Sequence, residues 1–246
     1  MTSAKLLYVC VRPQADAAAA EYESFRSAMR LRPEHLDRVD LVRELLPEDA
    51  VDRYAGFVVG GSPYNVADPE ETKTEQQRAV EAGLEHLAQA AADARLAGMF
   101  TCFGIGVVTR LLGGDVTRAY PEGTGPVAVQ LTDAGLRDPL FGPLATRFSA
   151  LTAHKEGTGA PPPDAVLLAT GEACPVQAYR VGSHLYATQF HPEPTPADFV
   201  ERMKVYRNDG YFDADAFDAT ADRVLAASVT EPLRLLHAFA KAFGEA

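Results

Sequence analysis

Over the first half of the chain, short apolar runs alternate with longer segments in which apolar residues recur at every third or fourth position. Short apolar runs favour buried β-strands, and the longer spacing is typical of one face of an amphipathic helix. The pattern predicts strands at residues 5–11, 39–42, 56–59 and 97–101, and helices at 14–31, 70–95 and 105–112. Because strands that alternate with helices form βα units, we expect an α/β fold with a mostly parallel central sheet flanked by helices.

The second half has shorter apolar runs between turns rich in glycine and proline, and predicts strands at 127–131, 147–151, 166–169, 176–181 and 184–190. After residue 193 helical spacing returns, and it ends in an amphipathic segment at 231–243. We expect one domain over residues 1–193 with a smaller β-rich part, and a C-terminal helical extension over residues 194–246 packed on the same domain. Aromatic residues of this extension, Tyr206 and Phe212 among them, indicate packing back onto the domain or the contact of a homodimer.

Composition and charge argue against a nucleic-acid-binding or membrane protein. The 246 residues carry 34 acidic against 23 basic side chains, a formal net charge of -11, which repels nucleic acid and anionic lipid. No run approaches the roughly 20 apolar residues of a membrane span, and residues 1–5 lack a signal-peptide layout. We therefore expect a cytoplasmic protein that binds a small molecule or another protein, with no nucleic acid and no membrane.

The chain has three cysteines, Cys10, Cys102 and Cys174, and no Cys-x-x-Cys pair. Disulfide frameworks and zinc sites need grouped cysteines or histidines. We expect no metal and no cofactor, and cysteine chemistry, if present, at one free thiol.

Cys102 lies where the strand predicted at 97–101 meets a predicted helix. A sharp strand-to-helix turn exposes the side chain at its apex, as in a nucleophile elbow. The N-terminus of the following helix favours the thiolate form of a cysteine placed there. A buried cysteine that packs as a small hydrophobic residue is the structural alternative.

A His-Pro-Glu tripeptide ends the last predicted strand, so that His191 and Glu193 stand two positions apart. In an extended chain such residues point to the same side. Glu193 can then orient the imidazole of His191, which accepts the thiol proton and returns it to a leaving amine. A loop cap would explain the same residues without chemistry.

Gly60 and Gly61 directly follow the strand predicted at 56–59. Residues without a Cβ let a backbone N–H face a cavity, as an oxyanion hole requires, and the N–H of Phe103 is the natural second donor. An ordinary tight turn is the alternative explanation.

Three segments together resemble the class I, or triad, glutamine amidotransferases. They are residues 57–63, 102–104 and 189–193, with Cys-Phe-Gly and Gln-Phe-His-Pro-Glu as the last two motifs, in the family's order and at about its separations. The resemblance covers about residues 5–193. It implies a flavodoxin-like class I glutamine amidotransferase fold, and hydrolysis of the glutamine side-chain amide through a γ-glutamyl thioester, with ammonia usually passed to a partner domain.

The resemblance also implies a role for each matching residue. Cys102 would be the nucleophile, His191 the base and Glu193 its orienting carboxylate. The amides of Gly61 and Phe103 would hold the oxyanion. Substrate binding falls to Gly60, Ser62, Gly104, Gly106 and His154, although a solvated turn is an alternative for His154.

The chain departs from the family motif Cys-x-Gly-His-Gln at its last two positions, which are Ile105 and Gly106. Neither residue supplies the hydrogen bonds with which the family's glutamine helps to hold substrate. We therefore expect weak hydrolysis of free glutamine, with either another γ-glutamyl compound as substrate or a partner protein that completes the pocket. With no synthetase module in the sequence, the expected forms are a subunit that supplies ammonia to a separate synthetase, or a free-standing hydrolase.

Two other interpretations stay open. One is a protease- or chaperone-like member of the wider superfamily; against it, Phe103 stands where those proteins commonly carry histidine. The other is a binding or regulatory protein that keeps the fold without turnover, which the Ile105-Gly106 departure favours.

Overall fold

The computed structural model describes residues 5–244, so the signal-peptide expectation for residues 1–4 lies outside the described residues. The strands are β1 (Leu6–Cys10), β2 (Leu36–Asp40), β3 (Gly56–Val59), β4 (Ala97–Thr101), β5 (Glu122–Leu131), β6 (Arg147–His154), β7 (Ala165–Gly171), β8 (Ala178–Val181) and β9 (Leu185–Thr188). The α-helices are α1 (Ala15–Ala28), α2 (Ala50–Arg53), α3 (Glu75–Ala92), α4 (Phe103–Leu111), α5 (Pro196–Val205), α6 (Phe217–Leu225) and α7 (Glu231–Phe243).

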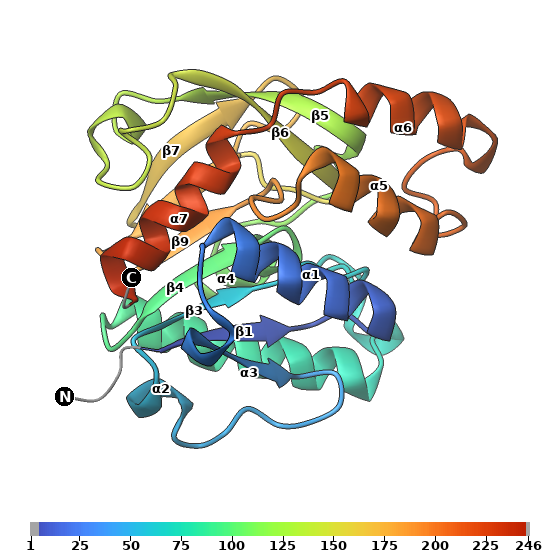
Figure 1. The fold of residues 1–246 in the computed structure, drawn as a ribbon. Helices are drawn as coiled ribbons and strands as arrows, with labels where there is room; N and C mark the ends of the chain where they lie inside the picture. The colour runs from blue at the N-terminus through green and yellow to red at the C-terminus, as the bar shows by residue number, and fades with distance from the viewer. Residues whose placement is uncertain (1–4, 245–246) are drawn as a thin grey trace.

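Within residues 5–244 the nine strands form one sheet in the order β2-β1-β3-β4-β9-β8-β7-β5-β6. The strands from β2 to β9 in this order are parallel, and each pair from β9 to β6 is antiparallel. Figure 1 shows helices on both sides of the parallel strands. The predicted α/β fold is confirmed, and its β-rich part continues the same sheet.

Successive side chains of the parallel strands point to opposite faces of the sheet, so that the hydrophobic core has one part on each face. In β1, Leu6 and Tyr8 pack with residues of α1 and α7, whereas Leu7 and Val9 pack with residues of α3 and α4. Successive strand residues point to opposite faces, and a parallel strand buried on both faces is apolar throughout. For this reason β3 and β4 have the bounds predicted for them.

Several predicted elements have other bounds in the structure, among them a helix and an edge strand of the first half of the chain. The helix predicted at 70–95 begins at Glu75, because the Thr74 side chain caps it by accepting the Gln77 N–H at 3.0 Å. The strand predicted at 39–42 runs over Leu36–Asp40 at the edge of the sheet, where it pairs with β1. Its alternating buried and exposed residues lack the continuous apolar run that marks the central strands.

The C-terminal helices pack within the chain. Helix α7 contacts α1 and β6, and α6 contacts β5. Phe199 of α5, Val224 of α6 and Leu151 of β6 share a small core of their own. Phe199 and Tyr206 are only 2% and 6% exposed, so of the two alternatives for these aromatic residues the structure favours packing back onto the chain. Among the described helices, none has the length and apolar character that crossing a bilayer requires.

Candidate active site

Cys102 occupies the corner between β4 and α4, at the edge where the parallel strands end. Its backbone adopts φ 50° and ψ -103°, and residues with a Cβ rarely hold a positive φ. Its N–H donates to the Thr188 carbonyl of β9 at 2.9 Å, and 8% of the residue is exposed. The neighbouring strand therefore holds the cysteine in a strained turn between a strand and a helix.

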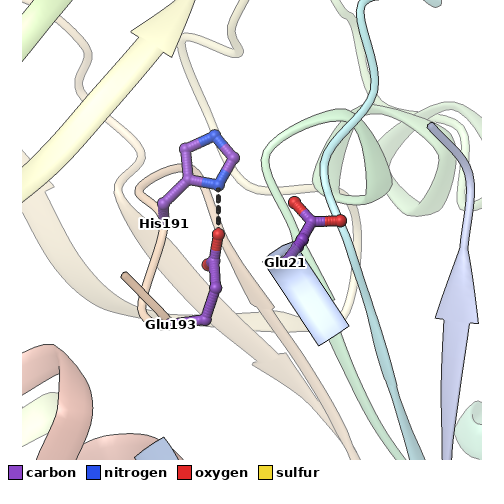
Figure 2. A group of neighbouring side chains, drawn as sticks. All are labelled: Glu21, His191 and Glu193. Atoms are coloured by element: carbon purple, nitrogen blue, oxygen red, sulfur yellow. Dashed lines mark hydrogen bonds and ion pairs between the residues drawn. The ribbon is translucent and has the colours of Figure 1, made fainter. Parts of the chain in front are cut away.

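His191 and Glu193 lie beyond the strand on which they were predicted, because β9 ends at Thr188. The N–H of His191 donates to the Leu151 carbonyl of β6 at 2.9 Å. Its imidazole Nδ1 lies 3.1 Å from Glu193 Oε1, as Figure 2 shows. The two side chains are therefore in contact, as predicted. They are positioned by the backbone hydrogen bond from His191 to Leu151 of β6, and not by the alternation of side chains along β9 that we expected.

Burial and neighbouring charges set the ionisation of this pair. Burial lowers the pKa of His191, but the negative charges of Glu193 and Cys102 outweigh it and raise that pKa to about 9. Burial raises the pKa of Glu193, yet the positive charges of His191 and Arg202 outweigh it and hold that pKa well below its usual range. The arrangement favours an imidazolium at His191 beside the ionised carboxylate of Glu193.

Two arginines and a further glutamate extend the pair into a buried charge network. Arg202 of α5 donates to Glu193 Oε1 at 2.6 Å. Arg12, which follows β1, donates to Glu21 Oε1 of α1 at 2.6 Å, and Arg202 Nη1 lies 3.5 Å from the same oxygen. Figure 2 shows Glu21 beside the His191–Glu193 pair. Arginines from two separate segments therefore bind the carboxylates of Glu193 and Glu21.

The sequence pattern does not predict this network. Its one local signal is Glu21, a charged residue at a position where the helical spacing of Ala18 and Phe25 predicts an apolar side chain. A charged residue at such a position is rarely buried without a partner. The partners themselves, Arg12 and Arg202, have no local signal.

Glu21, His191 and Glu193 also offer three possible metal ligands, with ligand atoms within 4.8 Å of one another. The guanidinium groups of Arg12 and Arg202 already bind the two carboxylates. A cation would have to displace both arginines, and a metal-binding imidazole must be neutral. This donor set suits the charge network better than a metal ion.

The two predicted oxyanion donors differ in their availability. A Cβ at Gly61 would lie 2.6 Å from His191 Cε1, which explains the glycine. The Gly61 N–H, however, donates to Glu21 Oε1 at 3.1 Å. Phe103 is the first residue of α4, and the first N–H groups of a helix have no partner within it. The Phe103 amide therefore offers a donor beside Cys102, whereas the Gly61 amide is engaged.

The other two cysteines have different surroundings. Cys10 lies within β1 and Cys174 between β7 and β8, and both are fully buried. Burial raises the pKa of the Cys10 thiol, and raises that of Cys174 to about 11. Neither stands at a strand-to-helix corner, so they serve as internal controls for Cys102.

No family model matches the chain. Over 152 residues it is 30% identical to the putative glutamine amidotransferase-like protein YfeJ of Salmonella typhimurium, a match that covers 62% of each protein. Over 151 residues it is 28% identical to gamma-glutamyl peptidase 3 of Arabidopsis thaliana, which covers 59% of this chain and 57% of that protein. The crystal structure of a glutamine amidotransferase from Thermotoga maritima aligns over 100% of both chains, with a TM-score of 0.74 and 17% identity.

The chain is similar in sequence and fold to class I glutamine amidotransferase-like proteins. Its matches span about three fifths of the length of these two curated relatives. A shorter match, 30% identical over 93 residues, is to a subunit of the glutamine-hydrolyzing GMP synthase of Methanothermobacter thermautotrophicus, and it covers 37% of this chain and 48% of that protein.

In this glutamine amidotransferase-like chain two side chains lie close to Gly106. A Cβ at Gly106 would lie 3.1 Å from Val66 Cγ2 and 3.5 Å from Glu156 Oε1. Glu156 accepts the N–H groups of Val66 and Ala67 at 2.7 and 2.8 Å, and burial raises its pKa. A carboxylate that no sequence motif indicates therefore lies beside the position at which the chain departs from the family motif.

Two cavities meet at Cys102. The first, which we call the polar cavity, has a volume of about 400 Å³ and is lined by Lys155 and Glu156 among other polar residues. The second, the apolar cavity, has a volume of about 430 Å³ and is lined by His191 and by aromatic residues of the C-terminal extension. The residues that line both are Ser62, Cys102, Ala153 and Tyr211.

Only some of the predicted substrate-binding residues line one of the two cavities. Ser62, Gly106 and His154 line the polar cavity. Gly60 and Gly104 are not among the residues that line either cavity within the described chain. A Cβ at Gly60 would lie 2.0 Å from a Glu21 oxygen, so this glycine faces the charge network.

His154 is buried, with 5% exposed, so the alternative of a solvated turn is wrong. Its Nε2 lies 2.8 Å from Glu122 Oε2, and its Nδ1 lies 2.7 Å from the Glu156 carbonyl oxygen. The imidazole thus joins the wall of the polar cavity to β5 and to the Glu156 backbone.

Proposed function

We propose that the protein is a cysteine-dependent amidohydrolase or amidotransferase that cleaves the side-chain amide of glutamine or of a related γ-glutamyl compound. One observation carries the proposal: Cys102, at the strained start of a helix, shares a cavity with His191, whose imidazole is bonded to the buried Glu193. A thiol beside an imidazole that a carboxylate orients is the arrangement of thiol-based acyl transfer.

In the proposed reaction the Cys102 thiolate attacks the amide carbonyl carbon and a carbon–sulfur bond forms. The Phe103 N–H at the start of α4 stabilises the oxyanion. His191 donates its proton to the amide nitrogen as the carbon–nitrogen bond breaks, which leaves a γ-glutamyl thioester and a free amine. Water then attacks the thioester with His191 as base, and release of the acid restores the thiol.

The roles of Glu193 and Arg202 follow from their contacts with the imidazole. Glu193 accepts a hydrogen bond from His191 Nδ1, which leaves Nε2 to exchange the proton with Cys102 and the amine. Arg202 bonds the same carboxylate oxygen at 2.6 Å and fixes its position. We assign Arg202 a positioning role, which makes the extension over residues 194–246 a working part of the proposed domain at 1–193.

Two forms of this activity have support among the relatives. The similarity to the GMP synthase subunit supports a protein that passes ammonia to a separate synthetase subunit. The similarity to gamma-glutamyl peptidase 3 supports a free-standing hydrolase. We propose the hydrolase as the principal form, because side chains of the chain's own extension enclose the cavity beside Cys102.

The proposal is tested by covalent trapping of Cys102 together with measurement of amide hydrolysis. A glutamine-derived chloroketone should modify Cys102 at neutral pH at least about 100-fold faster than Cys10 or Cys174, because the helix N-terminus and imidazole favour its thiolate. Cys102→Ser should abolish both the adduct and amine release from a panel of γ-glutamyl amides. Equal modification of the three cysteines, read by mass spectrometry of peptides, would refute the assignment.

A binding or regulatory protein is the second candidate. It is favoured by position 106, where a glycine beside Val66 and Glu156 stands in place of the family's glutamine. If Cys102 is trapped but no amide of the panel is cleaved, this second candidate replaces the first.

A further inference from the structure

The two cavities that meet at Cys102 have opposite chemistry, and an amide bond broken at this sulfur has two sides. The polar cavity presents Glu156 and Lys155. The apolar cavity presents Phe199, Met203 and Phe212. A substrate that places its carbonyl carbon at the sulfur must therefore place its acyl part on one side and its amine on the other.

His191 determines which side takes the amine. In the proposed reaction, on which this inference rests, His191 donates a proton to the leaving nitrogen. Its side chain lines the apolar cavity and is not among the residues that line the polar one. The amine therefore leaves into the apolar cavity, and the γ-glutamyl group, with its charged amino and carboxylate ends, lies among the polar groups.

The apolar cavity has little to offer a charged amine or a carboxylate. The two cations on its wall are already paired: Arg12 binds Glu21 and the Tyr206 hydroxyl, and Arg202 binds Glu193. Its wall includes the apolar side chains of Phe199, Met203 and Phe212. Ammonia, as the leaving amine, would make no apolar contact with these side chains.

We propose that the substrate is a γ-glutamyl amide whose amine carries an uncharged apolar group of about the size of an aromatic ring, and that the C-terminal extension forms the pocket for it. Helix α5 contributes Phe199 and Met203 to this pocket, and the loop before α6 contributes Phe212. Hydrolysis adds water across the carbon–nitrogen bond and gives glutamate and the free amine.

The experiment compares three amides: γ-glutamyl benzylamide, glutamine and γ-glutamylglycine. We expect kcat/KM for the benzylamide to exceed that for the other two by roughly 10- to 100-fold, from burial of the ring. Phe212→Ala should reduce this preference by about 5- to 20-fold.

Two variants serve as controls. Phe243→Ala makes the same change in α7, at a partly buried phenylalanine that lines neither cavity, and should retain the full preference. Phe212→Leu keeps apolar volume and should retain most of it. The thermal midpoint of each variant distinguishes a local effect from loss of the fold.

The outcomes separate this inference from the proposed function. Equal or better turnover of glutamine or of γ-glutamylglycine, unchanged by Phe212→Ala, overturns the apolar pocket and leaves the amidohydrolase in place. Trapping of Cys102 without cleavage of any amide overturns the proposed function itself.

Discussion

The parallel and antiparallel halves of the sheet contribute different parts of the candidate site. The parallel half supplies Cys102 at the end of β4, and the start of α4 beside it. The other half and the C-terminal extension supply the strand that anchors His191, the arginine on Glu193 and the wall of the apolar cavity. Strand β9, parallel to β4 and antiparallel to β8, joins the two halves.

The two halves differ in whether local sequence or long-range packing determines the position of the site residues. The proposed nucleophile, Cys102, stands on a scaffold whose central strands are buried between helices, so its position follows from the local strand and helix patterns. The proposed general base and the pocket depend on segments far apart in the chain. Changes in the second group should therefore alter rate, stability and substrate preference without removing the reactive thiol.

The largest expected effect comes from removing the base. His191→Ala should lower kcat/KM for amide cleavage by about 10⁴-fold, whereas Glu193→Gln should cost about 10²-fold, because the amide still contacts the imidazole. The double variant should be no slower than His191→Ala alone, because the two residues act as one unit. If the losses of kcat/KM from the two single variants add in the double variant, Glu193 acts independently of His191.

Arg202→Met tests the link between the extension and the triad. It removes one of the two cations beside the buried Glu193 carboxylate, which should lower the free energy of unfolding by about 3 kcal/mol. Lys204→Met, in the same helix, breaks only the exposed pair with Glu201 and should cost about 0.5 kcal/mol or less. Similar denaturation midpoints for the two variants would show that the network does not support the fold.

The pH dependence of stability tests the imidazolium. Because the pKa of His191 is raised from 6.5 to about 9 in the folded protein, its contribution should be fully present below about pH 6.5 and lost as pH rises through 9. The loss should be of the order of 3 kcal/mol in denaturant unfolding. Cys102→Ser removes the negative sulfur and should lower the pKa of His191, as read by NMR titration. An unchanged titration would contradict the thiolate–imidazolium pair.

The smallest effect is expected at the position where the chain departs from its family. Ile105→His with Gly106→Gln should change glutamine hydrolysis by less than about threefold, because a Cβ at position 106 would already lie 3.1 Å from Val66 Cγ2 and 3.5 Å from Glu156 Oε1. Gly106→Ala is the matched control for the added Cβ. A gain of about tenfold or more in ammonia release from the double replacement would show that the space is open.

The sequence by itself determined the parallel strands, most of the helices, and the corner at Cys102. Each of these elements has its own periodicity, and the corner is the point where the strand pattern stops and the helix pattern starts. It also determined that His191 and Glu193 are close, since two residues separated by one proline cannot lie far apart. The predicted cause, that both side chains point to the same side of one strand, was wrong. Strand β9 ends at Thr188, and the backbone of His191 pairs instead with Leu151 of β6.

Only the tertiary structure decided which groups surround that pair. Arg12, Glu21 and Arg202 belong to three different segments, and their burial depends on how α1 and α5 pack across the end of β1. In the same way, the folded chain engages the Gly61 amide with Glu21 and brings Glu156 beside Gly106. Contacts between distant residues leave no periodic signal in the chain, and a charged side chain gains a specific partner only when packing removes both from water.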